Sequence, residues 1–439
     1  LPFVWFTNQP TNAGTIQNTV ELTTSANIPT GFDFKANYKD IISAYPALFP
    51  STPNTTVPGS IAFVDPEFKM PQVWRSSLGA DIELPYGFDL SLNGLYTRDV
   101  YNVVQVNVNE KAPTGTFTGS GADNRPYYVA NTTATRRINN GVSTAMMLTN
   151  GTDKGYQYSL NATLSKRLIA GFSGMVSYTY TAAKDLTANP GSSASSAWSS
   201  NVAVGSLNDP GLSYSAFSVP HRIVSSLTYE LNLFDMSKTT FSMFYSGSHT
   251  GRVSYTGGND MNWDGNTSDL IYVPATADEL TFADITTTSG GVTTVTYSAA
   301  DQKTDFWNYI ENNSYLKSRK GQYAERYGDL RPWLNRFDFK VAENFDIKMG
   351  DRKYGLEISL NMLNIGNMIN PSWGTYKTMG ILSYDNAQVI KLKSISSAGV
   401  PTYQLNATNA TVFAANTTWK YNVSTSSTWG MILGAKVTF

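Results

Sequence analysis

One acidic stretch of this sequence has the spacing of a metal-binding loop. Its oxygen-bearing side chains belong to Asp260, Asn262, Asp264, Asn266 and Asp269. Alternate oxygen ligands with glycine at the sixth position, here Gly265, are how a calcium loop begins, because the glycine permits a sharp turn. The twelfth position holds Ile271 where a bidentate glutamate is expected, so Asp269 would have to substitute for it. The spacing predicts a Ca²⁺ site formed by these five residues, and the alternative is a polar loop held by Asx turns.

The remaining side chains argue against catalysis. His221 and His249 are the two histidines of the sequence and cysteine is absent, which disfavours a zinc site, a thiol nucleophile or disulfides. No G-x-S-x-G turn with triad partners is present. We expect His221, which follows Pro220 at the start of a strand, to make an interfacial hydrogen bond. Four tryptophans could stack on a sugar or peptide, although packing is the favoured interpretation: Trp198, Trp263, Trp307 and Trp373. We expect a protein that is not an enzyme.

The composition narrows the class of protein. The chain has 439 residues, of which 15% are charged and 13% are aromatic, and its mean hydropathy is −0.25. Low charge, many tyrosines and middling hydropathy are typical of a barrel wall with one polar and one apolar face. No apolar run of about 18 residues occurs, which excludes a helical membrane span. A net charge of −1 gives no basis for nucleic-acid binding. Because the chain begins LPFVWF, without a Met or an export signal, we expect a mature form or an excised part.

The segment that must organise the fold is the last one, Thr428–Phe439. Its odd positions are all apolar: Trp429, Met431, Leu433, Ala435, Val437 and Phe439. Its even positions are small or polar except for Ile432. Strict period-two alternation places one class of side chain on each face of a strand, and this strand is about long enough to cross a bilayer at a tilt. The segment resembles the closing strand of a Gram-negative outer-membrane barrel, whose terminal Phe, here Phe439, is an assembly signal.

The same alternation recurs upstream and predicts four hairpins. We expect them over residues 74–97, 156–181, 223–245 and 336–362, with tight turns that include 85–87, 168–171, 234–237 and 349–351. Long polar loops occupy 99–150, 184–215, 248–331 and 370–425, and the third should contain a short helix over Asp305–Lys320. Residues 1–71 are expected to be irregular and rich in loops. Short turns alternating with long loops are typical of outer-membrane barrels, in which all long loops lie at the extracellular end.

Charged side chains fall on the strand face opposite the tyrosine and leucine stripe. The set comprises Asp89, Arg222, Glu230, Arg336, Asp338 and Glu357. In a membrane barrel these residues would line the lumen, whereas in a soluble barrel or sandwich they would face solvent. Alternation alone does not distinguish a membrane barrel from a soluble barrel or sandwich. Aromatic residues gathered toward the strand ends favour the membrane barrel, in which they would form girdles. We expect about nine secure spanning strands and one or two more, since an even number is usual.

Longer segments identify a family resemblance. The segments at 68–99, 122–128, 219–231, 264–274, 321–345 and 360–377 resemble the barrel of TonB-dependent transporters, in particular the Oar-like group. That resemblance implies an all-β antiparallel transmembrane barrel of 22 strands with a plug inside it. This chain would supply the C-terminal portion, about 10 to 12 strands with long extracellular loops and a short loop helix. Residues 1–439 then form part of a single barrel domain, and the plug domain is not within them.

The resemblance also implies a function and partners. We expect energised uptake of a large ligand, such as a peptide, glycan or chelate, across the Gram-negative outer membrane. The partners would be outer-membrane lipid, the plug and N-terminal half of the barrel, TonB acting through that missing part, and a surface lipoprotein or other subunit. One alternative is a barrel that presents its loops to a surface partner without transport, and another is a soluble carbohydrate-binding β protein. Loops this polar reveal no ligand identity.

Overall fold

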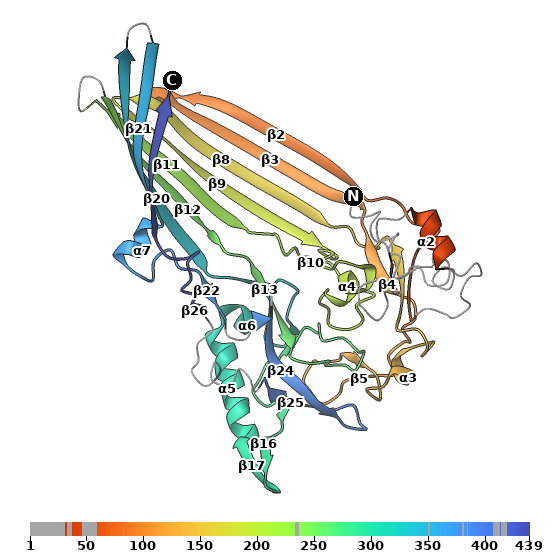
Figure 1. The fold of residues 1–439 in the computed structure, drawn as a ribbon. Helices are drawn as coiled ribbons and strands as arrows, with labels where there is room; N and C mark the ends of the chain where they lie inside the picture. The colour runs from red at the N-terminus through yellow and green to blue at the C-terminus, as the bar shows by residue number, and fades with distance from the viewer. Residues whose placement is uncertain are drawn as a thin grey trace.

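The computed structural model consists of a long antiparallel sheet with a folded mass of loops at one end (Figure 1). It describes residues 31–32, 37–45, 59–232, 237–349, 352–379, 382–383, 385–406, 413 and 419–439. Nine strands follow one another across this sheet, which we call the wall. They are β2 (Gln72–Leu84), β3 (Phe88–Tyr101), β8 (Tyr156–Ile169), β9 (Phe172–Asp185), β11 (His221–Leu231), β12 (Ser237–His249), β20 (Trp333–Met349), β21 (Arg352–Leu363) and β27 (Gly430–Thr438).

The four predicted hairpins are confirmed, and the last segment is a strand as predicted. Each hairpin pairs two consecutive wall strands antiparallel, and β27 pairs with β21. The first turn is a 3-10 turn over Pro85–Gly87, in which Tyr86 has a φ of 66°. The second turn places Gly171 at a φ of 85°, and a Cβ there would lie 2.4 Å from the Glu230 carbonyl oxygen, so only glycine fits. The predicted turns at 234–237 and 349–351 lie largely outside the described residues.

The strand register places all six predicted lumen residues on one face of the wall. Asp89 and Asp338 lie on the same cross-strand row, which runs Asp89, Ser165, Met175, Ser226, Phe244 and Asp338. Arg222 and Glu230 alternate in step with Ser226 along β11, and Arg336 does so with Asp338 along β20. Glu357 lies two residues from Ser359, which pairs with Ala342 on that same face. We call this the polar face. The opposite, apolar face carries rows such as Tyr229, Phe241, Val341, Leu360 and Leu433.

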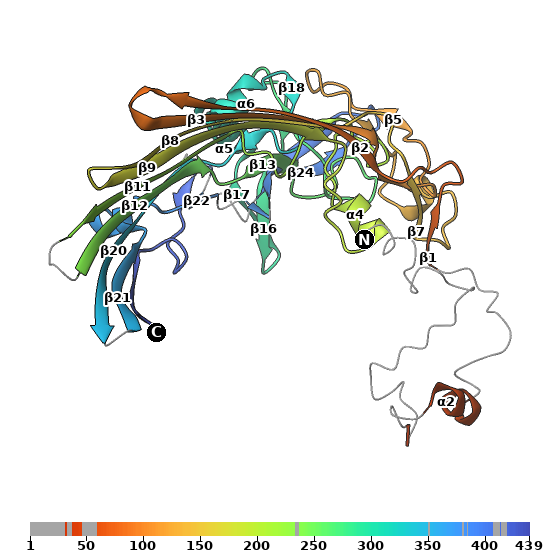
Figure 2. The same cartoon turned by 90° about the horizontal axis from the view of Figure 1, so that it is seen from above.

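The wall is curved and remains open in the described part of the chain. Seen from above, its strands form an arc (Figure 2). Among the described residues, β2 pairs with β3 alone and β27 with β21 alone. Each therefore has one hydrogen-bonded edge and one edge without a partner strand. No described helix is long and apolar enough to span a bilayer.

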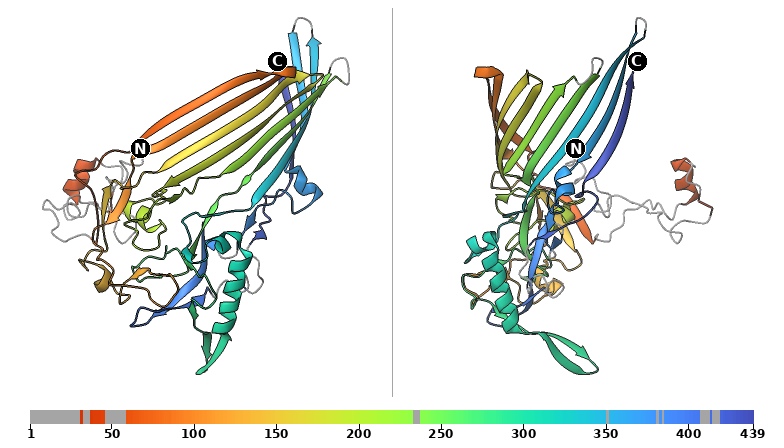
Figure 3. Two further views of the ribbon diagram at one scale, coloured as in Figure 1. Left: turned by 180° about the vertical axis from the view of Figure 1, so that it is seen from behind. Right: turned by 90° about the vertical axis from the view of Figure 1, so that its left-hand side faces the viewer.

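The long loops do not remain irregular, as the sequence suggested, but fold together into a unit that we call the loop head (Figure 3). After β3 it contains β4 (Val104–Asn107), β5 (Gly115–Thr116), β6 (Pro126–Tyr127), α3 (Thr133–Arg136) and β7 (Thr144–Thr149). After β9 come α4 (Ala194–Ser199) and β10 (Ser213–Tyr214). After β12 come β13 (Arg252–Gly257), β14 (Tyr272–Val273), β15 (Thr281–Phe282), β16 (Ile285–Ser289), β17 (Val292–Tyr297), α5 (Ala299–Asn312), α6 (Ser314–Ser318), β18 (Gln322–Tyr323) and β19 (Asp329–Leu330). After β21 come α7 (Ile365–Ile369), β22 (Lys377–Thr378), β23 (Leu382–Ser383), β24 (Asn386–Ile395), β25 (Pro401–Leu405) and β26 (Lys420–Tyr421).

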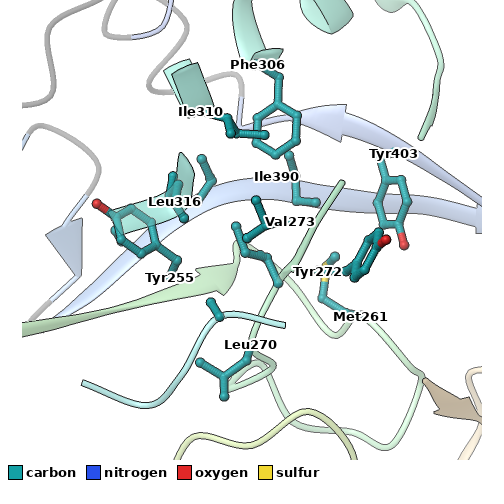
Figure 4. Close-up of a cluster of buried hydrophobic side chains, with 14 of the residues drawn as sticks. Tyr255, Met261, Leu270, Tyr272, Val273, Phe306, Ile310, Leu316, Ile390 and Tyr403 are labelled. Carbon is teal, nitrogen blue, oxygen red and sulfur yellow. The ribbon is translucent and has the colours of Figure 1, made fainter. Parts of the chain in front are cut away.

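A hydrophobic core within the loop head explains why these loops are ordered. It draws on distant segments, with Tyr255, Val273, Leu316 and Tyr403 all nearly or fully buried in it (Figure 4). Removing such side chains from water is the main favourable contribution to folding. The head is therefore a packed body rather than a set of independent surface loops.

The predicted loop helix is present with shifted bounds. Helix α5 begins after Ser298, whose side chain caps the Asp301 N–H, and it buries Phe306, Tyr309 and Ile310. The helix ends at Asn312, and Asn313 then caps α6. The partial helical spacing in the sequence reflected these buried positions, whereas the capping residues set the observed ends.

Most of residues 1–71 lies outside the described part of the chain. Within it, α2 (Tyr38–Ala44) is a short helix and β1 (Ser60–Val64) pairs parallel with β7. The prediction of irregular structure was therefore wrong for 60–64, where tertiary pairing with β7 determines the strand.

Candidate functional site

The acidic loop lies in the head, between β13 and β14, and its carboxylates mostly bind the backbone. Asp260 accepts through Oδ1 from the N–H groups of Asn262 (3.3 Å) and Asp264 (3.2 Å), and through Oδ2 from that of Gly265 (2.8 Å). Gly265 has a φ of 97°, the left-handed conformation that the calcium spacing anticipated. These bonds are Asx turns, the alternative that the sequence left open.

The other oxygen-bearing residues of the loop behave in the same way. The N–H of Asp264 donates to Asn262 Oδ1 (3.0 Å), and that of Asn266 donates to Asp264 Oδ1 (2.7 Å). Asp269 Oδ2 accepts from the N–H of Met261 (2.9 Å). Among the described residues, no group of three or more His, Cys, Asp or Glu side chains is arranged to hold a metal ion. The Asx turns fit the geometry, and calcium binding by this loop stays a prediction.

Burial changes the acidity of this loop. Burial, together with the nearby Asp260 charge, raises the pKa of Asp264 to about 7. Burial also raises the pKa of Asp260, and it raises that of Asp269 well above its usual range. A carboxylate withdrawn from water favours its neutral form. The loop therefore places several acids where full ionisation is unfavourable.

A buried arginine, which the sequence gave no reason to single out, binds this loop to its neighbours. Arg125 is 1% exposed and lies 3.7 Å from Asp269 and 3.9 Å from Asp123. It also donates to the Leu270 carbonyl at 2.6 Å, and its guanidinium lies over the ring of Tyr323. Arg125 belongs to the 122–128 segment that carried part of the family resemblance. Its position joins loops that follow β3 and β12.

A second buried arginine joins the head to the end of wall strand β9. Arg326, also 1% exposed, donates to the carbonyls of Leu186 and Asp185 and to Asn201 Oδ1 (3.0 Å). It also lies 3.1 Å from the Asp185 carboxylate. Asp185 is the last residue of β9, so this cluster fixes the loop after β12 to the loop after β9.

The polar face of the wall carries exposed ion pairs. Arg336 lies 3.6 Å from Asp338, and Lys340 donates to Glu357 at 3.0 Å. Glu230 pairs with Lys238 at 2.6 Å, close to the turn end of the hairpin. Pairs this exposed contribute little stability, about 0 to 1 kcal/mol each. Their placement on one face agrees with the predicted set, while their lumen role stays a prediction, as does the assembly role of Phe439.

The two histidines make hydrogen bonds, and three of the four candidate tryptophans pack in the head. His221 shares a hydrogen bond with the Tyr178 hydroxyl at 2.8 Å, while its position at a membrane interface stays a prediction. The His249 ring is hydrogen-bonded to the Arg331 carbonyl at 2.7 Å. Trp198 is buried, and Trp263 and Trp307 pack against the head core. Trp373 differs, because it is 54% exposed and lines a cavity of about 540 Å³.

The comparison with protein families points to the outer membrane. The model of the outer membrane beta barrel domain family matches residues 3–434. A comparison with curated proteins finds no match. Among solved structures, the outer membrane transporter YddB from Escherichia coli aligns with 87% of this chain and 35% of its own length. The chain thus spans about a third of that transporter, at 11% identity and a TM-score of 0.37.

Proposed function

Because the chain belongs to the outer membrane beta barrel domain family, we propose that it forms the C-terminal part of the wall of a TonB-dependent transporter of the Oar-like group. The family places the chain in the outer membrane, so the soluble β-protein alternative is dropped. The proposed activity is energised uptake of a large ligand, with the loop head at the extracellular mouth.

The open edges of the wall carry this proposal. A strand edge exposed to hydrocarbon leaves backbone N–H and C=O groups without partners, so membrane-spanning sheets close into barrels. Within the described residues β2 and β27 each lack one neighbour. Further strands paired with both edges would close the sheet, and the nine strands would then be a segment of a larger barrel. An N-terminal half of a transporter barrel, with its plug, would supply those strands.

The chemistry of the two faces supports the same arrangement. In a barrel wall the apolar face contacts lipid and the polar face lines the interior. The ion-paired polar face, including Arg336 and Glu357, would then contact a plug or a water-filled lumen. TonB would act through the plug and the segment before it, and a surface lipoprotein would contact the head.

The composition of the complex purified from its native membrane tests the proposal. Intact-mass measurement and peptide mapping of the detergent-extracted protein should find plug sequence, either in the same polypeptide or in a second fragment that copurifies. A complex without plug sequence that still resists detergent until boiled would overturn the transporter proposal. Uptake that stops when TonB is deleted would then identify the energy source.

The packed head favours a second candidate, a barrel that presents a docking surface without transport. A body with its own hydrophobic core can hold a fixed surface toward a partner. The two candidates differ in the plug, because a scaffold has no need of energy coupling. The mass measurement above therefore separates them.

A further inference from the structure

The cavity beside Trp373 opens on the apolar side of the wall, at its loop end. Trp333, Asn335 and Phe337 line it from β20, and Trp373 and Tyr421 line it from the loop after β21. The β20 residues alternate in register with Phe339 and Val341 of the apolar face. Helix α7 continues this surface, since Gly366 lies against both Trp373 and Phe337. The cavity is thus continuous with the surface that contacts lipid.

Helix α7, whose Gly366 lines this cavity, carries unusually exposed apolar side chains. Ile369 at its end is 70% exposed, and Met368 is roughly half exposed. Trp429, whose N–H donates to Asn367 of the same helix at 3.2 Å, is also roughly half exposed. Aromatic side chains form belts where barrel strands leave the hydrocarbon. With the loop head at the proposed extracellular mouth, this surface would lie at the level of the outer-leaflet headgroups.

One positive charge lies within this apolar setting. Lys377 is the one charged side chain among the described residues that line the cavity, and its ammonium lies 4.7 Å from the centre of the Tyr421 ring. Asn335, Ser372 and Thr375 add neutral polar groups to the lining. A cavity of about 540 Å³ falls within the usual size of small-molecule sites. The lining therefore combines an apolar wall, hydrogen-bonding groups and a single cation.

We propose that this cavity binds a phosphorylated lipid of the outer leaflet, with an acyl chain against Trp373 and Phe337 and the phosphate at Lys377. The inference rests on the location in the outer membrane and does not require the transport activity. An ammonium at the membrane surface attracts an anionic headgroup by about 1 kcal/mol, which corresponds to about a fivefold change in affinity. The aromatic wall would contribute binding that does not depend on the headgroup.

Native mass spectrometry of the detergent-purified complex tests this site with three probes. Dioleoyl phosphatidic acid carries both chains and phosphate, dioleoylglycerol carries the chains alone, and inorganic phosphate carries neither chain. We expect phosphatidic acid to bind best. Lys377→Ala should weaken its binding about fivefold and leave dioleoylglycerol unchanged. Trp373→Ala should weaken both lipids.

Lys420 provides the matched control. It lies next to Tyr421 on β26 and opposite Thr378, but it does not line the cavity. Lys420→Ala should therefore bind phosphatidic acid like the parent protein. Equal losses in Lys377→Ala and Lys420→Ala, equal binding of both lipids by the parent, or binding of inorganic phosphate alone would each overturn the proposal. If Lys377→Ala folds poorly, Lys377→Gln, which keeps most of the side-chain length and removes the charge, should show the same loss of about fivefold.

Discussion

Replacing Arg326 by methionine should release the loop head while leaving the wall intact. The guanidinium donates to Leu186, Asn201 and Asp185 from a position that is almost fully buried. Methionine keeps much of the volume but removes every donor. Breaking a buried ion pair by deleting one partner costs about 3 to 5 kcal/mol. The Asp185 side chain is 25% exposed, so water can solvate its carboxylate in the variant. We therefore expect a loss of stability at the lower end of that range, about 3 kcal/mol.

A loss of this size should raise the population of the open head by about two orders of magnitude. Limited proteolysis measures that population when the head recloses faster than the protease cuts. The Arg326→Met variant in detergent should therefore be cleaved within the head about 100-fold faster than the parent. The wall should remain folded, as judged by its heat-modifiable migration on a gel, because its strands are held by their own ladders.

Two variants control this experiment. Arg326→Lys keeps the charge but not the planar fork, so its cleavage rate should lie between those of the parent and Arg326→Met. Lys303→Met breaks an exposed pair with Asp278 and should change the rate by no more than a few fold. The reasoning fails if Arg326→Met and Lys303→Met are cleaved equally slowly, or if the wall is lost together with the head.

Three further predictions concern the wall and the head. Leu433→Arg, on the apolar face, should cost about 2 to 4 kcal/mol in a denaturant titration in lipid, whereas Ile432→Arg, its neighbour on the polar face, should cost little; equal costs would contradict the assignment of faces. Burial raises the pKa of Asp329, so the unfolded chain ionises first as pH rises above 3.8, and head stability should fall with rising pH until the raised pKa is passed. Asp329→Asn should reduce that dependence in a proteolysis series across pH, and the remaining slope belongs to other buried acids such as Asp264. For the acidic loop, Ca²⁺ should raise the melting temperature of the parent but not of Asp260→Asn, and identical melting in Ca²⁺ and in chelator would favour Asx turns alone.

The wall was predictable because its signal is local. Alternation along one strand, as in Trp429 to Phe439, already separates two faces, and a tight turn such as Pro85–Gly87 fixes the partner strand. The core of the head was not predictable in this way. Tyr255 and Tyr403 are buried in one core that distant loops form together. No periodic pattern in either segment predicts that burial.

The two buried arginines escaped notice for a related reason. Arginine is almost never fully buried unless it is paired, so Arg125 and Arg326 look like surface residues in a polar loop. Their partners are backbone carbonyls, which carry no signal in the sequence, and side chains such as Asp269 and Asp185 that lie far away along the chain. The acidic loop has a spacing that fits two structures. The Asp260 carboxylate can bind a metal ion, and it can also accept hydrogen bonds from nearby backbone N–H groups, as it does from Gly265.

The long-range bonds of the head imply an order of assembly. Tyr403 donates to Asp123 across 280 residues of sequence, and Thr118 donates to the Ala398 carbonyl across the same separation. Closing such long segments in a free chain is slow, because chain entropy is lost before any contact forms. Once the wall strands have paired, they hold the two ends of each of the four long loops close together. We therefore expect the wall to form first and the head to fold on it, so that a chain in transit to the membrane would travel with its head unfolded.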